Sequence, residues 1–317
     1  MAQGVQLGTA WTRRRERRAA RRASAHLNES NLTAYLMIAP MLGLLAVFVI
    51  YPLGYAIYLS GYRINFYKPP EWVGTEFYRY VLTDPDFRHS IRIGFTYALF
   101  TVPTGLVLAF LLASFLKTLS GVMAAVLKTT VYVPAVISSI IAAVVFSFIY
   151  QDQGLANWLI GLIGMKPVAW LNDPSTALPS IAAPGVWLGF GVSTLILLAA
   201  MLDIPSSYYE SARLDGANFL KTTIYITIPL LRNVFLFLIV TGFTLTIQEF
   251  QLPLIMTGGG PVDATTTPNL FIFNSFRDGT PYATSFSLTA SLILMVVLGT
   301  VSLIIFKVLR SEKAIDG

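Results

Sequence analysis

The stretch that decides the fold is residues 174–202, PSTALPSIAAPGVWLGFGVSTLILLAAML, which contains no Asp, Glu, Lys or Arg. A helix needs about 20 predominantly apolar residues to cross the hydrocarbon core of a membrane, and this run is longer. Its prolines would break a helix in water, but a membrane helix tolerates them because neighbouring helices satisfy the freed carbonyl groups. The run therefore predicts a membrane-spanning helix.

Runs of the same kind recur along the chain. The run from Asn233 to Val262 contains one charged residue, Glu249. The other charge-free runs are Leu32–Tyr62, Ile93–Leu116, Thr129–Gln151 and Gly279–Phe306. We therefore predict an all-α polytopic membrane protein with six transmembrane helices and both termini on the same side.

The composition excludes several other classes of protein. Of the 317 residues, 55% are hydrophobic and 12% are charged, against roughly a quarter charged in a soluble domain. An ordinary soluble enzyme is therefore ruled out. Because the chain has no cysteine, it has no disulfide framework, thiolate nucleophile or Cys-based metal site. His26 and His89 lie far apart, so we expect no metal site, no catalytic residue and no cofactor in this chain.

The distribution of basic residues predicts the orientation. An arginine cluster at residues 13–22 precedes the first run, and the positive-inside rule places such a cluster in the cytoplasm. Fifteen of the 22 Lys and Arg residues then lie on the cytoplasmic side. The net charge of +6 thus indicates contact with an anionic inner leaflet and not with nucleic acid, since the arginines lack an aromatic stacking platform. The predicted divisions are an arginine-rich cytoplasmic tail at 1–31, a six-span domain at 32–309 and a second cytoplasmic tail at 310–317.

Two segments between the runs are external on this topology. The segment from Arg63 to Arg92 mixes both charge signs with turn residues and aromatics, which indicates a small cap. The segment from Gln151 to Asp173 has apolar residues at near-helical spacing, so we expect a short helix along the membrane surface.

The longest cytoplasmic connection, residues 203–231, has a pattern of helix, glycine, helix. Pro205 and the two serines after it are start signals, and we place Glu210 in the first turn, where a carboxylate complements the helix dipole. Gly216 is typical of a helix end, and Asn218 is a good cap for the next helix. Such a helix pair is suited to docking in a groove of a cytosolic partner.

This connection resembles the EAA loop of permease subunits of binding-protein-dependent ATP-binding-cassette importers. The family pattern is Glu-Ala-Ala, then Asp-Gly-Ala three residues on, then an apolar stretch ending in Leu-Pro. The matching residues are Glu210-Ser211-Ala212, Asp215-Gly216-Ala217 and Ile228-Pro229. The departures from the pattern are Ser211, Thr223 and Asn233.

The resemblance implies the fold of a type I ABC importer permease, whose loop is a coupling helix that docks on an ATPase subunit. The implied coupling residues are Glu210, Ala212, Asp215, Gly216, Ala217 and Pro229. The implied partners are two ATPase subunits, which would hold the ATP and Mg, an extracytoplasmic solute-binding protein and a companion permease. This chain would then be a transport subunit and not an enzyme, in the inner membrane of a bacterium or archaeon. The alternative is that Asp215 and Gly216 are only a helix stop.

A glycine-rich turn follows the fifth run. It comprises Gly258, Gly259, Gly260 and Pro261, and it resembles the turn of the MalF-like, or glycerol-phosphate-permease-A-like, subunit. That likeness implies a MalG-like companion and a carbohydrate or glycerol-phosphate-like solute. A phosphate-binding loop is excluded because no Gly-Lys-Ser/Thr follows. A plain re-entry loop remains the alternative.

Glu249 is the candidate for the substrate pathway. A carboxylate within the membrane is costly and normally faces a cavity or a partner. Gln248, Glu249 and Gln251 would hydrogen-bond sugar hydroxyls, and Phe250 would stack on a sugar ring. The alternatives are a bond from Glu249 to the companion permease and a lipid-facing or interfacial position for Phe250.

Three rival functions remain. One is a permease of the same superfamily for polyamine, phosphate or another small solute. Another is a proton-coupled secondary transporter that uses Glu249, which predicts further buried carboxylates or an inverted repeat, and neither is found in the sequence. The third, a membrane-embedded enzyme, predicts paired catalytic groups at membrane depth, and none are found.

Overall fold

The computed structural model describes residues 33–65 and 68–309, which form two compact units. One unit ends at Leu59 and the other begins at Ser60. The arginine-rich tail at 1–31 and the tail at 310–317 lie outside the described residues, so the predictions about them remain predictions. Among the described residues, five helices are long and apolar enough to cross a membrane, and a bent helix pair makes a sixth.

The first unit supplies one of these helices. It runs from Thr33 to Leu59 over 27 residues. A π-helical turn, η1 (Ala46–Ile50), lies in its middle and leads into α2 (Tyr51–Leu59). This helix corresponds to the first predicted span.

The second unit begins with the predicted cap, which is built around one arginine. Strands β1 (Tyr62–Asn65) and β2 (Lys68–Trp72) pair antiparallel and are followed by α3 (Glu76–Thr83). Arg63 donates to both carboxylate oxygens of Glu76 at 2.7 Å and to Glu71 at 3.2 Å. The hydrogen bond from Arg63 lowers the pKa of the Glu76 carboxyl below its ordinary value.

Three long helices of the second unit begin and end close to the predicted runs. They are α4 (Pro85–Lys117), α8 (Pro174–Leu202) and α15 (Ala283–Leu309). Helix α4 begins earlier than the charge-free run because Asp84 accepts a hydrogen bond from the Phe87 N–H at 2.7 Å and Pro85 suits the first helical position. The fifth span consists of α12 (Arg232–Ile247) and the short α13 (Gln251–Met256), with a break between them.

The third predicted span is present as two helices and not one. Helices α5 (Gly121–Val136) and α6 (Ser139–Ile149) meet at an angle of 95°. Pro134 weakens the last turn of α5, and Ile137 has an extended backbone. Ser138 then accepts a hydrogen bond from the Ile140 N–H at 3.3 Å and starts the next helix. The charge-free run from Thr129 to Gln151 predicted the end of this pair to within two residues, but not its start at Gly121 or its bend.

The predicted short helix after this span is α7 (Leu155–Leu162). Its buried Asn157 organises the surrounding segment through its side-chain amide. The amide oxygen accepts from the Val168 N–H at 2.9 Å and from the Trp170 indole at 3.0 Å. The amide nitrogen donates to the carbonyls of Asp152, at 3.2 Å, and Val168, at 3.1 Å.

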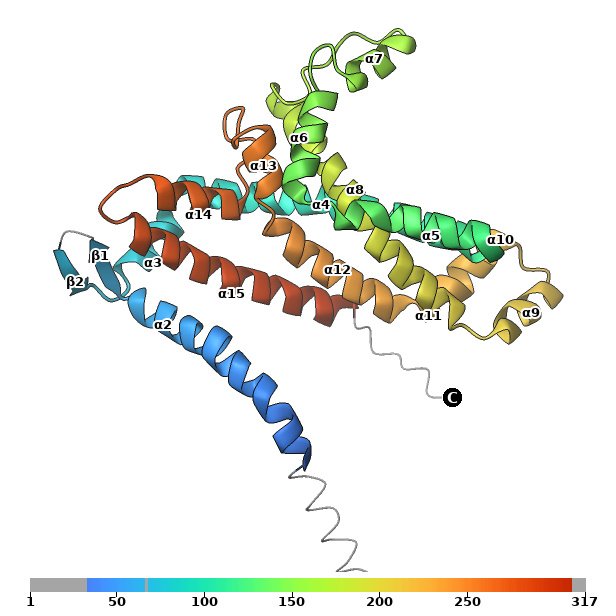
Figure 1. Ribbon diagram of the computed structural model, residues 1–317, viewed down its shortest axis with the longest axis horizontal. Helices are drawn as coiled ribbons and strands as arrows, with labels where there is room; N and C mark the ends of the chain where they lie inside the picture. Colours follow the sequence, from blue (N-terminus) through green and yellow to red (C-terminus); the bar gives the residue numbers. More distant parts are fainter. Residues whose placement is uncertain (1–32, 66–67, 310–317) are drawn as a thin grey trace, which may run out of the picture. The chain divides into compact units, whose positions relative to one another are not determined.

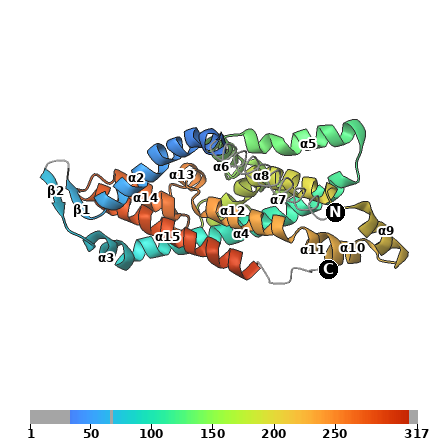
Figure 2. The same cartoon turned by 90° about the horizontal axis from the view of Figure 1, so that it is seen from below.

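The spans of the second unit pack around α4, which contacts α8 and α12. Helix α4 also contacts α14 (Pro268–Arg277) and α3, and α3 in turn contacts α15. Figure 1 shows the hairpin and α3 at one end of this unit and the segment after α8 at the other, and Figure 2 shows the same arrangement from below. One core cluster joins α4, α8 and α12 through Ala109, Ala113, Leu116, Leu197, Leu198, Met201 and Leu238. Small residues permit this close packing, because they let two helix backbones approach.

Gly191 gives a test of that packing. A Cβ at this position of α8 would overlap the Val131 carbonyl oxygen of α5, which is a backbone atom that cannot rotate away. We expect Gly191→Ala to destabilise the protein by about 1–3 kcal/mol. Gly299→Ala in α15 is the matched control, since its Cβ would meet nothing within 4 Å. The midpoints of thermal unfolding in detergent compare the two variants, and equal midpoints would contradict the expected contact.

Candidate functional site

The connection between α8 and α12 forms the predicted helix pair. Helix α9 (Ser206–Leu214) ends before Gly216, whose φ of +73° lies in the left-handed region that glycine adopts at low cost. The Asn218 side chain accepts a hydrogen bond from the Lys221 N–H at 2.9 Å and starts α10 (Phe219–Thr222). The turns η2 (Thr223–Thr227) and α11 (Ile228–Leu230) then lead into α12.

The placement of Glu210 in the first helical turn was wrong. Helix α9 begins at Ser206, so Glu210 lies in the second turn, and the first turn contains no acidic residue. The serine pair after Pro205 belongs to the helix itself, and no side chain caps its start. Glu210 is therefore an exposed carboxylate on the helix surface. Its favourable interaction with the helix dipole is small, because that interaction falls off beyond the first turn.

The other predicted residues of this loop divide into buried and exposed groups. Ala212 is buried and Ala217 half-buried, whereas Asp215, Gly216 and Pro229 are exposed. A groove of about 500 Å³ runs between the two short helices, and Ala212, Asp215 and Ala217 contribute to its lining. Large apolar side chains also face outward on this loop, namely Leu214, Phe219, Leu220 and Tyr225. Exposed apolar groups of this kind mark an interaction surface.

One lysine connects this loop to two spans. Lys117, the last residue of α4, donates to the Met201 carbonyl near the end of α8 at 3.0 Å. Its ammonium group also lies 4.0 Å from the centre of the Tyr209 ring in α9, which is a cation–π contact. Sequence reasoning missed this link, because nothing in the sequence relates Lys117 to a tyrosine that follows two spans later.

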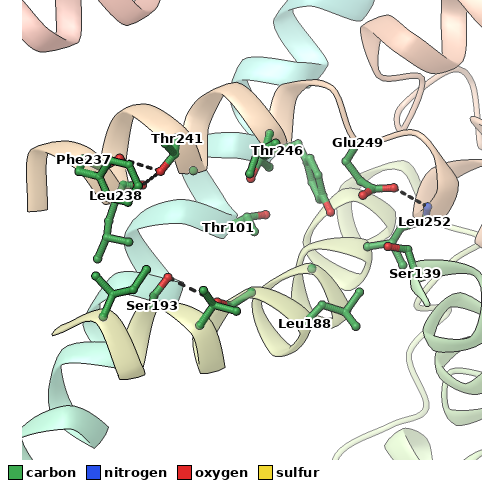
Figure 3. Close-up of a pocket in the computed structure, with 17 residues that line it drawn as sticks. Thr101, Ser139, Leu188, Ser193, Phe237, Leu238, Thr241, Thr246, Glu249 and Leu252 are labelled. Atoms are coloured by element: carbon green, nitrogen blue, oxygen red, sulfur yellow. Dashed lines mark hydrogen bonds between the residues drawn. The ribbon is translucent and has the colours of Figure 1, made fainter. Parts of the chain in front are cut away.

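A cavity of about 500 Å³ lies among the spans themselves. Its walls come from α4, α6, α8, α12 and α13, and Figure 3 shows Thr101, Ser193 and Thr246 around the same space. The apolar lining residues are Leu188, Val192, Ile196, Phe237, Leu238, Leu245 and Leu252. The polar lining residues are Tyr97, Thr101, Ser139, Ser193, Thr241, Thr246 and Glu249. Apolar walls with a few convergent polar groups are typical of a small-molecule site.

Glu249 is held at the break between α12 and α13. Its Oε1 accepts hydrogen bonds from the N–H groups of Gln251, at 2.7 Å, and Leu252, at 3.1 Å, and Figure 3 shows the bond to Leu252. These are two of the N–H groups that the start of a helix leaves without a partner in the helix. The carboxylate therefore has a structural function at the place where it lines the cavity.

The other predicted pathway residues lie outside this cavity. Gln248 donates from its side chain to the Thr244 carbonyl at 2.9 Å, within its own helix. Phe250 packs against Phe273, with 5.5 Å between ring centres, and lines a separate groove along α14 and α15. Gln251 is half-buried, and its backbone N–H donates a hydrogen bond to the Glu249 carboxylate.

The hydroxyl groups of the cavity were not predicted as a set. Thr101 belongs to α4 and Ser193 to α8, so they meet only because these two helices pack side by side. The Thr101 hydroxyl is buried and has no hydrogen-bond partner in the described part of the chain. The Tyr97 hydroxyl lies against Gly185, where a Cβ would be 2.6 Å away. No sequence signal relates these positions.

The glycine-rich turn is ordered by threonine side chains. Gly258 and Gly259 have φ values of +65° and +98°, and a Cβ on Gly259 would lie 2.6 Å from the Thr266 hydroxyl. Thr265 donates to the Gly260 carbonyl at 2.9 Å, and the next residue but one, Thr267, donates to the Glu249 carbonyl at 2.7 Å. Pro261 completes the turn. The turn is therefore attached to the backbone of Glu249.

Comparison with known proteins assigns the family. A family model described as "Binding-protein-dependent transport system inner membrane component" matches residues 101–313. The probable ABC transporter permease protein YesP of Bacillus subtilis is 30% identical over 91% of this chain and 94% of its own length. The trehalose/maltose transport system permease protein MalF of Thermococcus litoralis is 33% identical over 77% of this chain and 83% of its own length.

A solved structure has the same fold. It is a bacterial ABC transporter involved in the import of the acidic polysaccharide alginate, with a TM-score of 0.74 and 22% identity. The match covers 90% of this chain and 97% of that chain. Because the family model matches well over half of the sequence, this protein belongs to the family of binding-protein-dependent transport system inner membrane components.

Proposed function

We propose that this chain is a permease subunit of an ATP-driven importer and that it forms one half of the path for a carbohydrate. The observation that carries the proposal is the cavity among α4, α8 and α12, which combines hydroxyl groups with apolar walls. Sugars present both hydroxyl groups and apolar ring faces, so a lining of this kind suits them. The trehalose/maltose permease MalF among the relatives supports the same substrate class.

The helix pair α9 and α10 is the coupling element in this proposal. It projects into the cytoplasm and docks in a groove of an ATPase subunit, with Leu214 and Phe219 as its exposed apolar contacts. The contact residues are Glu210, Ala212, Asp215, Gly216, Ala217 and Pro229. Lys117 passes movement of this pair to α4 and α8, because it is bonded to both α8 and α9.

The complete transporter has several other chains. A MalG-like companion permease supplies the second half of the path, and two ATPase subunits bind and hydrolyse ATP with Mg. A solute-binding protein docks on the outer loops, which include the hairpin and the turn from Gly258 to Pro261. The assembly lies in the inner membrane of a bacterium or archaeon, with the termini of this chain in the cytoplasm.

Family membership favours this function over the proton-coupled carrier. A carrier needs Glu249 to take up and release a proton as its surroundings change. In the structure the Glu249 carboxylate accepts two backbone hydrogen bonds that start α13, so it has a structural function that a proton carrier does not require. The family model that matches residues 101–313 describes a component of a binding-protein-dependent transport system. This match supports an importer driven by partner subunits.

Gly216 tests the coupling assignment. Proline fixes φ near about −65° and cannot adopt the +73° of Gly216, so Gly216→Pro disrupts the turn between α9 and α10. A coupling free energy of 1–3 kcal/mol predicts that uptake per ATP hydrolysed falls roughly 5- to 150-fold. Proteoliposomes that contain all subunits measure both rates. Gly216→Asn is the matched control because asparagine tolerates this conformation, and normal uptake by Gly216→Pro would refute the assignment.

Lys117 tests the link between the helix pair and the spans. Lys117→Met keeps an unbranched, flexible side chain of similar length and removes the charge, so it breaks the cation–π contact with Tyr209 and the hydrogen bond to Met201. We expect uptake per ATP to fall about 2- to 10-fold, while the basal ATPase rate is unchanged. Lys128→Met, which makes neither contact, is the control. Equal coupling in the two variants would contradict the link.

Thr246 tests the path. Thr246→Val removes one hydroxyl from the cavity and keeps the shape of the side chain. Loss of one hydrogen bond predicts that KM for the imported sugar rises roughly 2- to 10-fold. Thr300→Val is the matched control, since Thr300 is exposed on α15 and donates to the Val296 carbonyl outside the cavity. An unchanged KM in Thr246→Val would place the path elsewhere.

A further inference from the structure

The charges around the central cavity are unbalanced. Glu249 is the single acidic residue among those that line it, and the described lining includes no lysine, arginine or histidine. Among residues 33–65 and 68–309, the ion pairs are those of Arg63 with Glu71 of the hairpin and with Glu76 of α3. The carboxylate of Glu249 is thus not neutralised by a cation of the described chain.

The carboxylate is also fixed in position. Movement of Glu249 out of the cavity wall would leave the N–H groups of Gln251 and Leu252 without their acceptor. The backbone beside it is held as well, because Thr267 donates to the Glu249 carbonyl at 2.7 Å and Asn269 donates to the Gln248 carbonyl at 2.8 Å. The negative charge therefore stays beside any solute that enters.

Coulomb's law gives the size of the effect. In a medium of effective dielectric constant 20, two like unit charges repel each other enough to lower affinity about a thousandfold at 4 Å and roughly thirtyfold at 8 Å. A hydroxyl group on a neutral solute has the opposite effect, because it donates a hydrogen bond to a carboxylate, and such charge-assisted bonds are strong.

We propose that Glu249 makes the path selective against anionic solutes, so that the substrate is a neutral or cationic sugar and not a uronate, sugar phosphate or sulfonate. This inference rests on the proposed transport of a carbohydrate. It narrows that function to a charge class, and it assigns the discrimination to one carboxylate whose other task is to start α13.

The test compares neutral disaccharides with their uronate counterparts. Maltose, trehalose and lactose, each paired with its 6-carboxylate, are bound to the purified permease–ATPase complex without the solute-binding protein, and affinities are measured by equilibrium dialysis. In the wild type we expect at least one neutral sugar to bind at least roughly thirtyfold more tightly than its uronate. In Glu249→Gln the difference falls to about threefold or less, because the charge is gone while the amide oxygen still accepts the hydrogen bonds at the start of α13.

Two further variants separate charge from structure. Asp152→Asn removes a carboxylate from an exposed position outside the cavity, and it keeps the wild-type difference. Glu249→Asp keeps the charge, and the discrimination persists. The thermal unfolding midpoint of Glu249→Gln stays at the wild-type value, since the acceptor at the start of α13 is retained.

The outcomes are distinguishable. Equal binding of a neutral sugar and its uronate to the wild type, including equality that arises from a compensating cation of the companion permease, overturns the inference and leaves carbohydrate transport standing. A difference that persists in Glu249→Gln assigns the discrimination to another group and also overturns it. If none of the neutral sugars binds to the wild type, the carbohydrate function fails, and the inference fails with it.

Discussion

Every backbone N–H and C=O group inside a membrane needs a partner from the protein itself, because lipid offers none. Several spans of this chain are interrupted, and at two of the breaks a particular side chain accepts backbone hydrogen bonds. Ser138 accepts from the Ile140 N–H where α5 turns into α6, and Glu249 accepts from two N–H groups where α13 begins. Lys117 donates to the Met201 carbonyl near the end of α8. Of these residues, Glu249 also lines the cavity and Lys117 also contacts Tyr209 of α9.

Glycine determines where the cavity forms. Gly185, Gly189 and Gly242 all line it, and of these three Gly189 leaves open space, since its Cβ would meet nothing within 4 Å. The same helices touch where glycine meets a larger group, as at Gly185 with the Tyr97 hydroxyl and at Gly242 with Val102, where a Cβ would be 3.1 Å away. On α8, open space at Gly189 therefore lies one turn away from the close contact at Gly185.

Local signals in the sequence predicted local structure well. The helix, glycine, helix pattern around Gly216 and the cap at Asn218 are confirmed, because φ preference and side-chain capping act within a few residues. The first turn of α9 was misplaced, since serine fits both a cap and a helix interior position and only tertiary packing decides between them. The bend at Ile137 was missed because hydropathy records how apolar a run is and not where it changes direction.

The cavity could be predicted only at Glu249, where a charge interrupts an apolar run. Its partners Thr101 and Ser193 come from spans that are far apart in sequence, and a hydroxyl in a membrane helix is unremarkable because it bonds to its own backbone, as Ser193 does with Gly189. The convergence of such groups depends on helix packing, which a single sequence does not specify.

The hydroxyl groups of Thr265 and Thr266, which follow the glycine-rich turn, form hydrogen bonds within the turn segment. Thr265 bonds to Gly260, and Thr266 bonds to Gly259 and to the Asp263 carboxylate. What the turn presents outward is instead Val262, with 87% of its surface exposed at a φ of +50°. A protein that binds this turn would recognise the shape of an apolar side chain on an ordered backbone. Its affinity would then depend less on the polar residues around Val262 than on the conformation of the turn.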